Sequence, residues 1–220
     1  MRCELPSDLP KLGHRPYIQG GSIFNGILDA CDRSFGPTWL QDAVISSFKL
    51  ERESVANGKF VLSDVKMASV EPNATFVARS PSKRIFVDYF DEGRPVRQEP
   101  YDEESYYRVV QLGSKLEGSF TFPAGRPRED FMRAVVGANK RLHQETTRFA
   151  APLTRIQFLY LTGLDANCIV RSSQEYEVRI HNVSAQERGA EVWTMNHVNV
   201  RARNFSAQLR ICYRAARQTS

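Results

Sequence analysis

The segment Gly21–Phe35, which reads GSIFNGILDACDRSF, decides the first long element of the fold. Its apolar side chains recur at the spacing of an α-helix, which gives that helix one buried face. The residues on this face are Ile23, Phe24, Ile27, Leu28 and Cys31. Gly36 and Pro37 then end the helix, because glycine favours a helix C-terminus and proline cannot continue one. The sequence therefore predicts a long helix with one buried face near the N-terminus.

Strand-like segments follow this helix. They are residues 43–50, 59–68, 74–79 and 84–90. Each is rich in β-branched or aromatic residues, and polar or turn-forming residues separate them. The pair Asn57-Gly58 stands between the first two segments and is typical of a tight hairpin turn. The polar, acidic stretch 94–105 is the best candidate for a linker.

The same order of elements then repeats. Two strand-like segments, 106–112 and 115–122, precede a helical pattern over 128–147. Further strands are predicted at 155–161, 175–183, 190–202 and 205–213. The last three alternate apolar and polar residues, as antiparallel strands with one solvated face do. With few helices and many strands, we predict an α+β fold of two halves, residues 1–98 and 99–220. Each half would be a curved antiparallel sheet wrapped around a long helix.

The composition is that of a folded globular protein. The chain has 220 residues, of which 41% are hydrophobic and 25% are charged, and this excludes disorder as the main state. No apolar run approaches the roughly 18–20 residues of a membrane span, and residues 1–16 lack the apolar centre of a signal peptide. The four cysteines form no CxxC motif, which argues against zinc ribbons and redox motifs. We expect a cytoplasmic protein with free thiols and no membrane segment.

The net charge of +5 is divided unevenly along the chain. Residues 1–110 contain 14 basic and 16 acidic residues, whereas residues 111–220 contain 16 basic and 9 acidic ones. Most of the excess is arginine, which suits bidentate contacts with phosphate. The second half therefore fits a nucleic acid, a phosphorylated carrier such as coenzyme A or a phosphopantetheine arm, or a basic surface that is merely solvated.

The stretch Gly13–Ala30, GHRPYIQGGSIFNGILDA, resembles the loop and helix start of hot-dog dehydratases. Its pairs Tyr17-Ile18 and Phe24-Asn25 also resemble FcoT-like acyl-CoA thioesterases of mycobacteria. The second half is similar to these thioesterases at residues 139–142 and 149–153, but it has no His-Pro-Gly loop. The resemblance implies a double hot-dog fold whose site is asymmetric, with one half catalytic and the other supporting.

The resemblance also implies roles for several residues. Hot-dog enzymes hold the thioester carbonyl near the N-terminus of the central helix, where backbone N–H groups point outward. Gly20 and Gly21 stand there and would form an oxyanion hole, unless they only shape the loop. In hot-dog dehydratases a histidine removes the α-proton and an acid protonates the leaving hydroxyl. His14 and Asp29 would take these roles, and an exposed histidine and a solvent-facing carboxylate are the alternatives.

Other polar residues complete the candidate site. Tyr17 would polarise the carbonyl or orient water, or else pack as a hydrophobic staple. Asn25 lies four residues before Asp29 on the same stripe of the helix and would serve hydrolysis. In the second half, Asn139 and His143 share one helix face as a base with its orienting group, or as a buried histidine packed against its helix. No cluster of ligands has the spacing of a metal site, and we expect neither a metal nor a cofactor.

We predict an enzyme that acts on acyl thioesters of coenzyme A or acyl carrier protein. The first reaction is dehydration of a 3-hydroxyacyl thioester, or hydration of the enoyl thioester, and the alternative is hydrolysis of the thioester. A second alternative is a non-catalytic binding or scaffold protein that uses arginines of the basic half, such as Arg201, Arg203 and Arg210. For the enzyme we expect no nucleic-acid or membrane partner. The sequence leaves open whether the protein forms a homo-oligomer.

Overall fold

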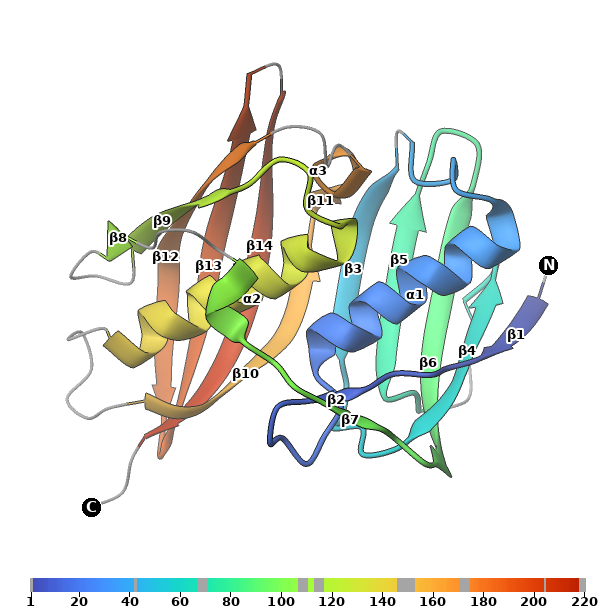
Figure 1. The fold of residues 1–220 in the computed structure, drawn as a ribbon, viewed down its shortest axis with the longest axis horizontal. Coiled ribbons are helices and arrows are strands. Elements are labelled where there is room, and N and C mark those ends of the chain that lie inside the picture. The colour runs from blue at the N-terminus through green and yellow to red at the C-terminus, as the bar shows by residue number, and fades with distance from the viewer. Residues whose placement is uncertain are drawn as a thin grey trace. The chain divides into compact units, whose positions relative to one another are not determined.

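A computed structural model describes residues 2–41, 43–66, 71–106, 111–112, 117–145, 153–170, 175–203 and 205–217. The chain divides into two compact units (Figure 1). Unit 1 contains Met1–Asp102 together with the short segment Asp165–Asn167, and unit 2 contains Glu103–Leu164 and Cys168–Ser220. The first boundary thus falls between residues 102 and 103, and one segment of the second half of the chain belongs to unit 1.

Unit 1 is an antiparallel sheet with one long helix. Its elements are β1 (Arg2–Pro6), β2 (Lys11–Leu12), α1 (Gly20–Phe35), β3 (Val44–Leu50), β4 (Asn57–Ser63), β5 (Ala74–Arg79), β6 (Arg84–Arg94) and β7 (Gln98–Glu99). The strands lie in the order β1-β4-β6-β5-β3, and all neighbours are antiparallel. The short strands β2 and β7 form a separate parallel pair. The helix predicted at residues 21–35 is confirmed.

The apolar face of α1 packs on this sheet. All five side chains predicted to be on the buried face of the helix are buried. The ring of Phe24 meets Phe48 at a centroid distance of 5.3 Å and Phe76 at 6.1 Å, both edge-on. Gly26 allows α1 to approach closely, since a Cβ there would lie 2.6 Å from Leu9 Cδ2 and 2.9 Å from Phe60 Cζ. Edge-on aromatic contacts and close packing therefore fix α1 against the sheet.

The hairpin turn predicted at Asn57-Gly58 is wrong. Both residues lie in β4, which pairs with β6 and β1 and not with β3. The buried side chain of Asn57 accepts a hydrogen bond from the Leu9 N–H at 2.7 Å and donates to the Leu9 and Pro95 carbonyls. A Cβ on Gly58 would lie 1.7 Å from the Phe90 carbonyl oxygen. Glycine at this position thus lets the β4 backbone come close to the β6 backbone, where the register of the two strands shifts. From the sequence alone, an Asn-Gly pair in this role looks the same as an Asn-Gly pair in a hairpin turn.

Unit 2 contains a larger antiparallel sheet and the second long helix. From Glu103 on, the elements are η1 (Glu103–Tyr106), β8 (Gln111–Leu112), β9 (Glu117–Phe122), α2 (Arg128–Glu145), β10 (Leu153–Thr162), β11 (Leu164–Asp165), α3 (Asn167–Val170), β12 (Tyr176–Arg188), β13 (Glu191–Ala202) and β14 (Phe205–Arg217). The strand order is β8-β9-β12-β13-β14-β10, with antiparallel neighbours throughout.

The predicted strand at 106–112 is corrected by the structure. Among its described residues, Tyr106 ends the 3₁₀ helix η1, and Gln111–Leu112 forms the strand β8. Residues 107–110 of this segment lie outside the described part of the chain, as do residues 67–68 of the strand predicted at 59–68.

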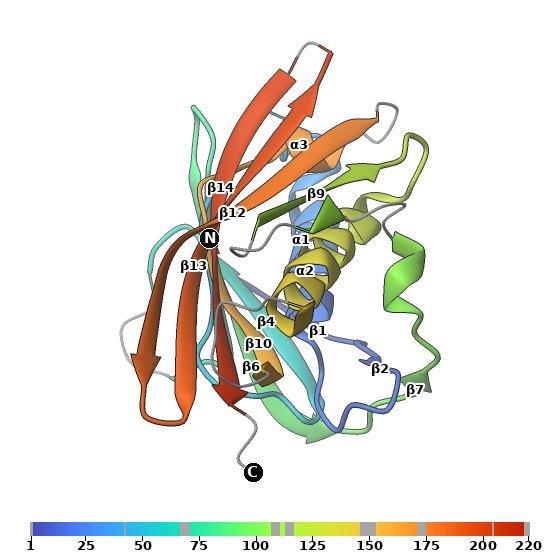
Figure 2. The same ribbon diagram turned by 90° about the vertical axis from the view of Figure 1, so that its left-hand side faces the viewer.

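α2 covers one face of the unit 2 sheet (Figure 2). The ring of Phe131 on α2 meets Phe122 at 5.6 Å and Tyr176 at 6.3 Å, both edge-on. Along β13 the side chains alternate between buried and half-buried, and the buried ones face α2. The predicted alternation is therefore confirmed for β13 and for the start of β12, whereas three consecutive residues of β14, Ile211, Cys212 and Tyr213, are buried. Among the described residues, no helix has the length and apolar character needed to cross a membrane.

Candidate site at the start of the first helix

α1 begins with two backbone N–H groups that have no acceptor within the described part of the chain. The carbonyl of Gln19, the residue that caps the helix, accepts hydrogen bonds from the N–H groups of Ser22 at 3.0 Å and Ile23 at 3.1 Å. The N–H groups of Gly20 and Gly21 are therefore left over at the helix end. The Gln19 side chain makes no capping hydrogen bond, and the first turn holds no acidic residue. The helix start thus favours a partial negative charge on a bound group.

Ser22 adds a third polar group to this helix start. Its side chain is buried, and its Oγ has no hydrogen-bond partner among the described residues. A buried hydroxyl without a partner is costly and calls for an explanation. The sequence does not single out Ser22, because a serine after two glycines is equally typical of an ordinary helix start. Gly21 is not required by packing either, since a Cβ on it would meet nothing within 4 Å.

The loop that leads into α1 carries His14 and Tyr17. A backbone hydrogen bond of 2.7 Å from the Ile18 N–H to the Ser54 carbonyl holds the end of this loop. His14 is exposed and makes no hydrogen bond or ion pair with the described residues. Tyr17 is half-buried and engaged in contacts of its own. The ring of His14 is therefore accessible to a ligand, whereas Tyr17 packs partly against its surroundings.

The two polar candidates on α1 lie in different surroundings. Asn25 is buried, and it follows Gly21 by about one helical turn. Asp29 is exposed and comes nine residues after Gly20, which is about 13 Å along the helix axis at the usual rise of 1.5 Å per residue. No hydrogen bond or ion pair among the described residues joins Asp29 to His14. The structure therefore places Asn25 near the helix start with Gly21, and Asp29 farther along the exposed side.

Asn139 and His143 are both buried on the face of α2 that meets the sheet, with exposed fractions of 0% and 1%. His143 Nδ1 lies 2.6 Å from the Asn139 carbonyl oxygen, and His143 Nε2 lies 2.6 Å from Thr194 Oγ1. Because a carbonyl only accepts, Nδ1 carries the proton and Nε2 accepts from the Thr194 hydroxyl. Burial lowers the pKa of His143 to about 4, so the ring is neutral near pH 7.

The amide of Asn139 extends this buried network into the sheet. Asn139 Nδ2 donates to the Val135 carbonyl at 2.9 Å, and Asn139 Oδ1 accepts from Asn196 Nδ2 at 2.8 Å. Asn196 Oδ1 in turn accepts from Asn182 Nδ2 at 2.9 Å. The side chains thus connect α2 to β13 and β12 with their polar atoms paired, which is the arrangement of a packing network. The two residues predicted as a base and its orienting group lie inside it, away from solvent.

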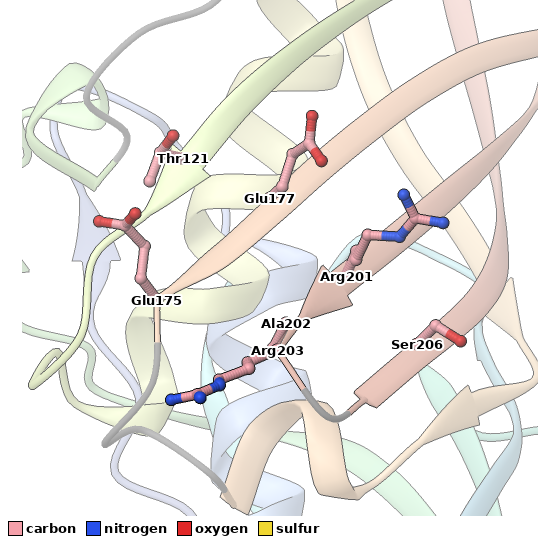
Figure 3. A pocket seen from close by; sticks show the side chains of 7 residues that line it. All are labelled: Thr121, Glu175, Glu177, Arg201, Ala202, Arg203 and Ser206. Carbon is pink, nitrogen blue, oxygen red and sulfur yellow. The ribbon is translucent and has the colours of Figure 1, made fainter.

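A shallow hollow of about 710 Å³ lies on the other face of the unit 2 sheet, turned away from α2. It is lined by Thr121, Glu175, Glu177, Arg201, Ala202, Arg203 and Ser206 (Figure 3). A smaller hollow of about 510 Å³ continues it toward Arg179 and Gln208. Carboxylates line one side and guanidinium groups the other, so this face suits charged partners. Among the described residues, no group of three His, Cys, Asp or Glu side chains could hold a metal ion.

Comparison with known proteins identifies the fold and not the family. No model of a known protein family matches the chain, and no curated protein matches it. A hot-dog fold protein of unknown function from Alicyclobacillus acidocaldarius matches with a TM-score of 0.54 at 10% identity, over 100% of this chain and 94% of its own. A protein from Thermobifida fusca described as a candidate thioesterase II matches with a TM-score of 0.50 at 14% identity, over 98% and 92%.

A bifunctional dehydratase-cyclase domain of ambruticin biosynthesis matches with a TM-score of 0.47 at 12% identity, over 92% of this chain and 83% of its own. The matching structures with the higher TM-scores span almost the whole of this chain. The large antiparallel sheets and few helices of the two units agree with that likeness. The chain therefore has a hot-dog fold.

Proposed function

We propose that this chain is an enzyme that acts on acyl thioesters, and that its two units form a double hot-dog. The observation that carries this proposal is the start of α1, where the N–H groups of Gly20 and Gly21 and the hydroxyl of Ser22 have no partner among the described residues. The fold is one in which the neighbour from Thermobifida fusca is described as a candidate thioesterase. The substrate would be an acyl chain on coenzyme A or on an acyl carrier protein.

The helix start would polarise the thioester carbonyl. When a base removes the α-proton, or when water attacks the carbonyl carbon, negative charge develops on the carbonyl oxygen. The backbone N–H groups of Gly20 and Gly21 would stabilise that charge by donating hydrogen bonds, and they already point in the required direction. The dipole of α1 adds to this stabilisation. Glycine at both positions leaves room for the thioester to approach the backbone.

The first candidate reaction is dehydration of a 3-hydroxyacyl thioester, or its reversal. His14 would remove the proton at C2, a C2–C3 double bond would form, and the C3–O bond would break as the hydroxyl leaves as water. Asp29 would donate the proton to that hydroxyl. Because Asp29 lies about 13 Å beyond Gly20 along the helix, this route needs a water molecule between the carboxyl group and the hydroxyl. The accessible ring of His14 in the loop before α1 supports this reaction.

Hydrolysis is the second candidate, and the position of Asn25 favours it. Asn25 is buried about one turn after Gly21, so its amide lies nearer to the helix start than the carboxyl of Asp29 does. Together with the hydroxyl of Tyr17, it would orient a water molecule for attack on the carbonyl carbon. The products are then a free carboxylic acid and the thiol of the carrier.

One panel of substrates separates the two reactions. The purified chain is incubated with saturated, 3-hydroxyacyl and 2-enoyl thioesters, each on coenzyme A and on an acyl carrier protein, and the products are weighed by mass spectrometry. Loss or gain of one water with an intact thioester supports dehydration or hydration, and release of free thiol supports hydrolysis.

Variants assign the residues in the same assay. His14→Ala and Asp29→Asn should abolish dehydration, and Asn25→Ala should abolish hydrolysis. If no thioester in the panel is turned over and none raises the melting temperature, the proposed function is wrong.

A further inference from the structure

The unit 2 sheet has a solvent-facing side that none of the proposed chemistry uses. Along β13, the side chains of Val192, Thr194 and Asn196 are buried and face α2, where Thr194 bonds His143 and Asn196 bonds Asn139. The residues between them point to the opposite side. We call this opposite side of β10, β14, β13 and β12 the outer face of unit 2. The hollow of Figure 3 lies on it.

Three arginines on the outer face carry charge that no carboxylate compensates. Arg201, Arg203 and Arg210 are exposed and have no ion-pair partner among the described residues. The acidic side chains described on the same face, Glu175 beside the arginines and Glu177 and Glu191 on the strands, have interactions of their own. Glu177 holds Arg179 at 2.7 Å, and Glu191 accepts a hydrogen bond from Trp193 Nε1 at 3.1 Å. The outer face therefore presents guanidinium groups that are free to pair with an anionic partner.

The part of the outer face around Trp193 is apolar. Trp193, Met195 and Tyr160 are half-buried there, on strands that lie next to β14 on its two sides. The Tyr160 hydroxyl lies 4.0 Å from Met195 Sδ, and the guanidinium of Arg188 lies 5.5 Å from the centre of the Trp193 ring. The same sheet surface thus carries two large aromatic side chains and a thioether in addition to the three exposed arginines.

This combination of side chains selects the kind of partner. Tryptophan, tyrosine, methionine and arginine are the residues enriched where proteins bind one another, and the cations described on this face are arginine rather than lysine. A second copy of the chain would bring its own uncompensated arginines and be repelled. An acidic protein surface would pair its carboxylates with the exposed arginines, and its apolar side chains would cover the aromatic rings.

We propose that the outer face of unit 2 is a docking surface for an acidic protein, whose carboxylates pair with Arg201, Arg203 and Arg210 and whose apolar side chains cover Trp193. The proposal does not depend on the thioester chemistry at α1, because all of its residues lie on the sheet of unit 2. It adds a binding partner to the protein whichever reaction takes place at the other site.

A titration with a model acidic ligand tests the proposal. The probe is a synthetic peptide of alternating Glu and Leu residues, added to the full-length chain while tryptophan fluorescence is recorded. Only two tryptophans are present, and Trp39 is buried in unit 1, so a fluorescence change that disappears in a Trp193→Phe variant comes from Trp193. We expect saturable binding that shifts the emission of Trp193. Poly-glutamate, which lacks leucine, should bind more weakly.

Matched variants show where the peptide binds. The triple variant Arg201→Gln, Arg203→Gln and Arg210→Gln should weaken binding about tenfold, as the loss of three exposed charge contacts implies. The triple variant Arg33→Gln, Lys66→Gln and Arg79→Gln removes the same charge from exposed positions of unit 1 and should leave the affinity unchanged.

Three results would overturn the proposal. They are the absence of saturable binding by the Glu-Leu peptide, an equal loss of affinity in both triple variants, and tighter binding of a single-stranded oligonucleotide of equal charge than of the peptide. The last result would make the outer face a nucleic-acid surface instead.

Discussion

At the scale of single residues, His143 shows how burial sets the charge of a side chain. Its folded pKa is about 4, below its usual value of 6.5, because burial disfavours the charged ring and outweighs the hydrogen bond to the Asn139 carbonyl, which favours it. Between these values the unfolded chain binds a proton that the folded chain does not. The stabilisation is therefore complete above pH 6.5 and is lost as the pH falls toward 4.

We predict that the titration of His143 contributes to the loss of stability in acid. The free energy of unfolding should fall by roughly 3 kcal/mol between pH 6.5 and pH 4, at about 1.4 kcal/mol per unit of pKa difference. Urea unfolding at a series of pH values measures it. A His143→Gln variant should be less stable at pH 7 but show a flatter pH profile. An unchanged slope in His143→Gln would contradict this account.

Gly21 allows the helix start to be probed without disturbing the fold. Since a Cβ at Gly21 meets nothing within 4 Å, Gly21→Ala should leave the free energy of unfolding unchanged or raise it by up to about 1 kcal/mol. The new methyl group would stand where we place the thioester carbonyl, and turnover should fall at least about tenfold.

Gly58→Ala is the matched control for Gly21→Ala. Its Cβ would overlap the Phe90 carbonyl oxygen, and the free energy of unfolding should fall by about 2 kcal/mol or more. Chemical unfolding and thioester turnover are measured on both variants. Full turnover in Gly21→Ala would place the carbonyl elsewhere.

At the scale of elements, the distance between α1 and its sheet depends on Gly26. Alanine is the better helix former, yet a Cβ at this position would press on Leu9 and Phe60. We predict that Gly26→Ala lowers the free energy of unfolding by about 1–3 kcal/mol, because overpacking outweighs helix propensity. Calorimetry or urea unfolding measures the change. Adding Leu9→Ala should cost less in this variant than in the native chain, and additive effects would show that the two residues do not compete for space.

Long helices and strands could be predicted from the sequence, because an element that is buried on one face has apolar residues at regular intervals. The period of 3.6 in the first helix and the period of two in β12 and β13 gave those elements directly. The Asn57-Gly58 pair misled, because a glycine needed for close approach has the same sequence signature as a glycine needed for a turn. β1, at the edge of the sheet, was not predicted: its exposed and half-buried side chains alternate, but over only five residues, none of which is buried.

The candidate site could be predicted only in part for a related reason. The glycines at the helix start were found because they stand in a loop-helix motif, but the unpaired hydroxyl of Ser22 depends on what packs around it. Asn139 and His143 have the spacing of a catalytic pair and lie in a buried network instead. Residue types and spacing place side chains on one face of a helix, and only the packing shows whether that face meets solvent or a sheet.

At the scale of the whole molecule, the two units are interleaved along the chain. Residues 165–167 belong to unit 1 although they lie within the second half, and the Ala166 N–H donates to the Ala43 carbonyl at 2.9 Å. We predict that a chain cleaved by a protease site inserted between residues 102 and 103 keeps its two fragments together in native gel filtration. The same cleavage in an Ala166→Pro variant, which lacks that N–H, should let the fragments separate more readily. Separation of the fragments in the parent chain would contradict this prediction.

The segment at residues 165–167 also limits how such a gene can recombine. A genetic crossover at the boundary between the units would join the first half of one chain to the second half of another. Residues 165–167 of unit 1 would then come from the other chain. Halves from two ancestors could be exchanged only if that short stretch stayed compatible with the first unit. Inheritance should therefore favour the chain as one block over the reshuffling of its halves.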